Sequence, residues 1–110
     1  MAECRFTKKA EADLTGIASY SLERWGEARA VRYIDRLEAC CERLANHPSL
    51  GRRCDRVRPG LRRLETGSHV VFYREEAGGI LVSRVLHKSM LPEAHWFDDD
   101  EVGTAVKVPD

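Results

Sequence analysis

Residues 8–45 read KKAEADLTGIASYSLERWGEARAVRYIDRLEACCERLA, and this stretch decides the fold. Apolar residues recur in it at the spacing of one helix face, first at Ala10, Leu14, Ile17, Ala18 and Trp25, and then at Ala30, Val31, Ile34, Leu37, Cys41 and Leu44. Gly26 lies between the two sets, and glycine commonly ends a helix. The stretch therefore predicts helices over 8–25 and 27–45 that fold back on each other as a tight antiparallel pair.

Strands are predicted on both sides of this helical hairpin. Residues 3–7 read as a short strand, and Thr7 can cap the first helix through its hydroxyl. After a connecting loop over 46–60, apolar runs separated by glycine-containing turns predict strands over 61–66, 69–74 and 80–87. The last run is almost continuously apolar, which predicts a place at the centre of the sheet. The expected fold class is α+β, with an N-terminal strand and a helix hairpin packed on a small, mostly antiparallel sheet.

A chain of 110 residues fits one domain. We expect that domain to span 1–97, with one helical turn over 91–97, and the acidic segment 98–110 to form a mobile tail. The first residues lack the apolar core of a signal peptide, and no stretch reaches the roughly 20 apolar residues of a membrane span. A cytoplasmic protein without a membrane partner is therefore predicted.

Formal net charge is zero, but the charges are unevenly distributed. Six arginines crowd one short stretch: Arg52, Arg53, Arg56, Arg58, Arg62 and Arg63. Such a stretch can contact nucleic acid phosphates, meet the carboxylates of a protein partner, or simply be a solvated loop. The four cysteines match no zinc-site spacing, so we expect reduced, partly buried thiols and neither a metal nor a cofactor.

Six short segments occur in an order that is informative: 10–14 (AEADL), 23–28 (ERWGEA), 46–52 (NHPSLGR), 58–62 (RPGLR), 70–74 (VVFYR) and 84–90 (RVLHKSM). Together they resemble the ParE/RelE toxin superfamily, and the last segment is similar to the ParE signature. The resemblance implies a toxin of a type II toxin–antitoxin system. ParE-like members inhibit DNA gyrase and so block replication, RelE-like members cut messenger RNA on the ribosome, and a cognate antitoxin silences both.

The resemblance favours a ParE-like gyrase inhibitor that is not an enzyme, is neutralised by a ParD-like antitoxin and meets nucleic acid only indirectly. The alternative is a RelE-like ribosome-dependent endonuclease, for which the candidate catalytic residues are Arg62, His69, Lys88 and His95. The basic cluster of that branch is incomplete in this chain. A third possibility is a member that has lost toxicity and remains a binding module.

Antitoxins of this family fold against the toxin as a helix and a strand, which implies a groove and a sheet edge. The residues predicted to bind the antitoxin are Tyr20, Trp25, Tyr33, Arg56, Arg58, Arg62, Arg63 and Arg74. Tyr20 and Tyr33 lie off the apolar stripes and are better candidates than Leu14, Ile17 and Leu37, which are expected in the core. His69 and His87 could share a sheet face, although a structural role for each is the simpler interpretation.

Overall fold

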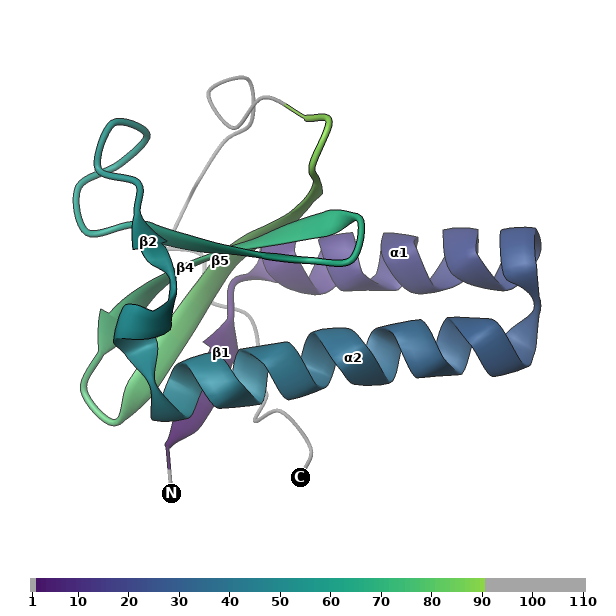
Figure 1. Ribbon diagram of the computed structural model, residues 1–110, viewed down its shortest axis with the longest axis horizontal. Coiled ribbons are helices and arrows are strands. Elements are labelled where there is room, and N and C mark those ends of the chain that lie inside the picture. The colour runs from purple at the N-terminus through teal and green to yellow at the C-terminus, as the bar shows by residue number, and fades with distance from the viewer. Residues whose placement is uncertain (1, 91–110) are drawn as a thin grey trace.

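Two helices pack on one face of a five-stranded sheet in the computed structural model, which describes residues 2–90 (Figure 1). The elements in chain order are β1 (Glu3–Phe6), α1 (Lys8–Trp25), α2 (Glu27–Asn46), the short 3-10 helix η1 (Pro48–Leu50), β2 (Arg52–Arg53), β3 (Arg62–Thr66), β4 (His69–Glu76) and β5 (Gly79–His87). The strand order is β1-β5-β4-β3-β2, with β1 parallel to β5 and the other neighbours antiparallel. The predicted α+β class and helical hairpin are confirmed.

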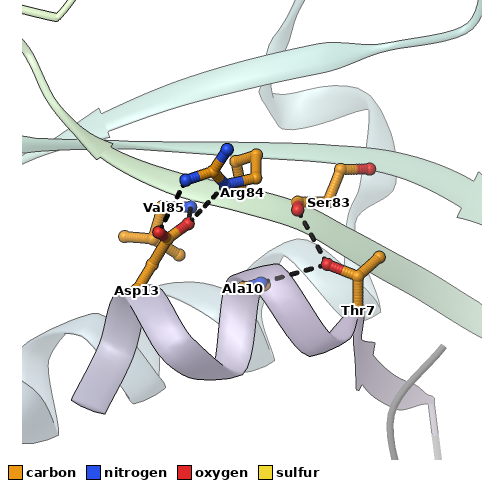
Figure 2. A network of polar contacts seen from close by, with 6 residues as sticks. All are labelled: Thr7, Ala10, Asp13, Ser83, Arg84 and Val85. Atoms are coloured by element: carbon orange, nitrogen blue, oxygen red, sulfur yellow. Dashed lines mark hydrogen bonds and ion pairs between the residues drawn. The ribbon is translucent and has the colours of Figure 1, made fainter. Parts of the chain in front are cut away.

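Thr7 joins the start of α1 to the sheet. Its hydroxyl accepts a hydrogen bond from the Ala10 backbone N–H at 3.1 Å and donates one to the Ser83 carbonyl at 2.8 Å (Figure 2). Ser83 lies at the register shift between β4 and β5, where its carbonyl is turned toward the helix. The predicted cap is confirmed, and it also attaches α1 to β5.

Replacing Thr7 by valine keeps the side-chain shape and removes both bonds. Because Thr7 and Ser83 are fully buried, we expect the free energy of unfolding to fall by about 1–3 kcal/mol, measured by urea denaturation. Thr15→Val is the matched control, since the Thr15 hydroxyl is exposed and bonds only the Glu11 carbonyl of its own helix. Equal losses in the two variants would contradict this role for Thr7.

Two details of the predicted sheet are wrong. β4, rather than β5, occupies the middle of the strand order, because β1 pairs with the outer side of β5 and β2 extends the opposite edge. The segment 46–60 is not a continuous loop, since it contains η1 and β2. The buried Tyr73 hydroxyl holds this segment by donating to the Pro48 carbonyl at 2.6 Å and accepting from the Gly51 N–H at 2.8 Å.

Alternate residues of β4 and β5 face opposite sides of the sheet and form two cores. The core under the helices includes Ala10, Ile17, Leu37, Cys41, Leu44, Val71, Tyr73 and Val82. A smaller core on the other side contains Leu61, Val70, Phe72 and Leu86, covered by Cys54 and Val57. The second core explains why the segment between β2 and β3 carries apolar residues.

The helical stripes are only partly buried. Val31 is 52% exposed although it lies on the predicted apolar stripe, and Trp25, which is one of the residues predicted to bind the antitoxin, is 37% exposed. The buried side of the two helices instead includes Ser21 on α1 and Cys40 and Cys41 on α2. The buried face of α2 differs from the predicted one because the helix packs against both α1 and the sheet. Val31 lies outside this buried face, whereas Cys40 lies within it.

Three predictions fall on residues that the structure does not describe: the helical turn over 91–97, His95, and the acidic tail over 98–110. In the described part of the chain, no helix is both long enough and apolar enough to cross a membrane.

Candidate functional site

Five rings form a continuous row from the end of the helical hairpin to the sheet. The ring centroids lie 6.3 Å apart between Tyr20 and Trp25, 6.1 Å between Trp25 and Tyr33, 5.5 Å between Tyr33 and His69, and 5.4 Å between His69 and His87. We call these five residues the aromatic row. It unites three predicted antitoxin-binding residues with both strand histidines, and it draws on α1, α2, β4 and β5.

Tyr33 connects the helical part of the aromatic row to the sheet, because its hydroxyl forms hydrogen bonds with residues of the sheet and of the β3–β4 turn. The hydroxyl accepts the Ser68 backbone N–H at 3.0 Å and lies 2.5 Å from His69 Nδ1. Gly67 makes this approach possible, since it has a φ of +57° and a Cβ there would lie 2.8 Å from the Tyr33 ring. The β3–β4 turn therefore has a glycine where α2 touches the sheet.

A cavity of about 460 Å³ opens beside the aromatic row, between α1 and the ends of β4 and β5. It is lined by Asp13, Gly16, Ile17, Tyr20, Ser21, Trp25, Ser68, His69, His87 and Met90. Its apolar and aromatic members are Gly16, Ile17, Tyr20, Trp25 and Met90, and its polar members are Asp13, Ser21, Ser68 and the two imidazoles. Such a cavity suits a buried apolar or aromatic side chain from a partner.

Asp13 lies in this cavity wall, but its carboxylate is fully engaged. It accepts two hydrogen bonds of 2.8 Å from the Arg84 guanidinium and one of 2.9 Å from the Val85 N–H (Figure 2). This arrangement ties α1 to β5. Asp13 therefore serves the framework of the cavity and is not placed to move a proton.

A neutral His69 with its proton on Nε2 can accept a hydrogen bond from the Tyr33 hydroxyl at Nδ1. Because the Tyr33 hydroxyl already accepts the Ser68 N–H, its own proton is available to His69 Nδ1. Burial, and then the neighbouring His87, hold the pKa of His69 below its ordinary value. Both effects favour the uncharged ring that Tyr33 needs.

The lowered pKa of His69 predicts a loss of stability in mild acid. The unfolded chain takes up this proton near pH 6.5, whereas the folded protein does so only at lower pH. The stabilisation is thus complete above about pH 6.5 and is lost as pH falls through the folded value. We expect the melting temperature to drop more between pH 7.5 and 5.5 for the wild type than for His69→Gln. Equal drops would contradict this assignment.

The three predicted catalytic residues that the structure describes, Arg62, His69 and Lys88, do not gather at one place. Lys88 follows His87, and its N–H bonds the Ser68 carbonyl, so it lies near His69. Arg62, however, pairs with Tyr73, four residues along β4 from His69, or about 13 Å at 3.3 Å per residue. Its Nη1 donates to the Gly51 carbonyl at 2.7 Å.

The predicted antitoxin-binding arginines lie away from the aromatic row. The loop after β2 and the tip of the helical hairpin are at opposite ends of the fold (Figure 1). Arg63 approaches Glu65 at 3.7 Å and stacks on Phe72, so it has a structural role, while Arg56 is exposed. Arg58 and Arg74 are half-buried. The predicted set is thus divided between two surfaces, and its role in binding remains a prediction.

An arginine surface on α2 was missed by sequence reasoning. Arg29, Arg32, Arg36 and Arg43 are all exposed, and their spacing of three, four and seven residues puts them on one flank of the helix. We call these four residues the arginine flank. A groove of about 370 Å³ runs beside it, lined by Trp25, Arg29, Arg32, Tyr33, Arg36, Gly67 and Ser68. The spacing of these arginines along the sequence is the signal that could have predicted this surface.

Three of the four thiols are buried and therefore poorly placed to react, while Cys54 is half-buried. Cys4, Cys40 and Cys41 are buried, and burial, followed by the charge of Cys41, raises the pKa of the Cys40 thiol to about 11. Within residues 2–90, no three His, Cys, Asp or Glu side chains come together in a way that could hold a metal ion.

Residues 4–92 match the sequence model of a family described as the ParE toxin of the type II toxin–antitoxin system parDE. The chain belongs to the ParE toxin family. It is 43% identical over 95 residues to toxin ParE1 of Caulobacter vibrioides, covering 86% of this chain and 98% of that protein. It is also 43% identical over 82 residues to toxin ParE1 of Mycobacterium tuberculosis, covering 74% of this chain and 84% of that protein.

A solved structure confirms the ParE fold. A chain of the chromosomal ParDE toxin–antitoxin system from P. aeruginosa superposes with a TM-score of 0.66 at 23% identity, covering 79% of this chain and 96% of that chain. The family assignment that the sequence segments suggest is confirmed by the family model and by the 43% identity to toxin ParE1, and the solved structure confirms the fold.

Proposed function

We propose that this ParE toxin acts in the cytoplasm by binding and inhibiting DNA gyrase, and that a ParD-like antitoxin keeps it inactive. The observation that supports this most is the match to ParE toxins along nearly the whole described chain. The antitoxin partner is supported by the similar solved structure from P. aeruginosa, which belongs to a ParDE toxin–antitoxin system.

Binding rather than catalysis accounts best for the geometry. A nuclease of the RelE type needs a base and several cations around one phosphate. Here Arg62 lies about 13 Å along the sheet from His69, and the only carboxylate in the lining of the cavity, that of Asp13, is engaged by Arg84. We infer that the toxin is not an enzyme.

The aromatic row is the surface best suited to the antitoxin. Tyrosine, tryptophan and arginine are the residue types that dominate binding energy in protein interfaces. Tyr20 is 58% exposed and Trp25 37% exposed, and both border the cavity of about 460 Å³. An apolar side chain of the antitoxin would enter this cavity and cover the two rings.

The test is a supercoiling assay with purified gyrase and purified toxin. We expect the toxin to inhibit supercoiling or to trap cleaved DNA, and the antitoxin encoded beside it to reverse the effect. Normal supercoiling at a large excess of toxin would overturn the gyrase assignment. Cleavage of ribosome-bound transcripts after induction would instead support the endonuclease.

A further inference from the structure

We infer that the arginine flank of α2 binds a carboxylate-rich segment of the antitoxin, with acidic side chains spaced three and four residues apart. This inference rests on the proposed function, because it assumes that an antitoxin binds this toxin. It assigns a second contact beside the aromatic row and names the chemistry of the partner there.

Charges on α2 are sorted by sign around the helix. At roughly 100° per residue, the four arginines fall within an arc of about 60°. The acidic residues fall within a separate arc of about 80°: Glu27, Asp35, Glu38 and Glu42. A helix optimised only for its own stability would alternate the signs at four-residue spacing, whereas Arg32–Arg36 and Glu38–Glu42 are like-charge pairs. The separation of positive and negative side chains on α2 therefore indicates that the arginine side binds a negatively charged partner.

The arginine flank has no internal acidic partner. Among the residues that the structure describes, no ion pair involves Arg29, Arg32, Arg36 or Arg43. By contrast, Arg5, Arg53 and Arg84 each lie about 3 Å from a carboxylate oxygen. Several guanidinium groups of the flank are thus available together on one exposed surface.

The groove beside the arginine flank brings Arg29, Arg32 and Arg36 together in one hollow. Arg29 lies 4.9 Å over the Trp25 ring, which holds its guanidinium at the end of the groove nearest the aromatic row. Arg29, Arg32 and Arg36 follow one another along the axis at about 4.5 and 6 Å, at 1.5 Å per residue. Carboxylates at positions three and four apart on a facing helix have the same separations, and the arginine fork suits carboxylates.

Nucleic acid is a poorer fit than an acidic peptide. A helix with its side chains is only about 10–12 Å across, so the acidic arc lies within roughly one screening length of the arginine flank. A long polyanion would be repelled by that arc, and the whole chain has no net positive charge to compensate. A short acidic segment can lie on the arginine side alone.

The test uses the full chain and a fluorescein-labelled 15-residue helical peptide with four glutamates at this spacing, with fluorescence anisotropy as the readout. The matched peptide replaces every glutamate by glutamine. We expect the toxin to bind the glutamate peptide at least tenfold more tightly. The double variant Arg32→Glu/Arg36→Glu should lose at least tenfold in affinity and bind a lysine version of the peptide instead.

Lys8→Glu/Arg24→Glu is the control, since it changes the net charge equally at two exposed positions of α1 and should bind within twofold of the wild type. Thermal melting verifies that each variant folds. No preference for glutamate over glutamine, or an equal loss in the control, would overturn the inference. Tighter binding of a 15-nucleotide oligo-dT, lost in the same double variant, would assign the flank to nucleic acid.

The supercoiling assay separates this inference from the proposed function. A toxin that inhibits gyrase but does not prefer the glutamate peptide would leave the proposed function intact and refute only the inference. A toxin that binds the peptide through the arginine flank but leaves gyrase active would refute the gyrase target and leave the flank assigned to an acidic partner.

Discussion

Replacing Asp13 by alanine is expected to lower the free energy of unfolding by about 3–5 kcal/mol. The Asp13 and Arg84 side chains are each only 14% exposed, and the Asp13 carboxylate also accepts the Val85 N–H. Truncation would remove two charge-assisted hydrogen bonds from a largely buried guanidinium and one acceptor from the Val85 N–H. Because a domain of this size is stabilised by only about 5–15 kcal/mol, this loss is a large fraction of the total.

Urea denaturation followed by circular dichroism measures the effect. Asp13→Asn keeps the volume and one acceptor oxygen, so it should lose less than the alanine variant. Glu23→Ala removes an exposed carboxylate from the same helix and should stay within about 0.5 kcal/mol of the wild type. A change below about 1 kcal/mol for Asp13→Ala would show that the contact between α1 and β5 contributes little.

Replacing Trp25 by alanine is expected to weaken antitoxin binding by about 30- to 1000-fold, equivalent to about 2–4 kcal/mol. Trp25 contacts Tyr20, Tyr33 and Arg29, and it borders both the cavity and the arginine groove. It is therefore at the centre of the surface that we assign to the antitoxin, where truncation costs most.

Calorimetric titration with the purified antitoxin measures the loss. Urea denaturation of the same variant separates this loss from a loss of stability, because Trp25 is only 37% exposed and its ring contacts Tyr20 and Tyr33. Leu50→Ala is the control, since Leu50 is a large exposed side chain in η1, away from the aromatic row. Affinities within threefold of the wild type for Trp25→Ala would place the antitoxin elsewhere on the toxin.

Local features of the fold were predictable from the sequence. The α1 bounds agree with the prediction, and α2 extends only one residue further, to Asn46. These ends are set by contacts within a few residues: the Thr7 hydroxyl meets the Ala10 N–H, and Gly26 has a φ of +85° that glycine readily adopts. The hairpin turns likewise contain glycines with positive φ, Gly67 at +57° and Gly78 at +83°.

The candidate site was only partly predictable. Tyr20, Trp25 and Tyr33 were proposed from their places on the helices, and the structure brings them together. Arg62 and His69 were proposed as one catalytic set, yet the antiparallel register of β3 and β4 separates them. The sequence does not single out the arginine flank, because spacing alone does not reveal which charges pair elsewhere in the fold.

The sequence by itself determined the two helices, their caps, the turns and the family of this toxin, because these depend on side chains close together in the chain and on short recognisable segments. Only the tertiary structure decided the order of the strands, the place of β2, the ion pair between Asp13 and Arg84, and the meeting of Tyr33 with His69. Each of those contacts joins residues that are far apart in the chain, and their geometry follows from how the helices and strands pack rather than from any local preference.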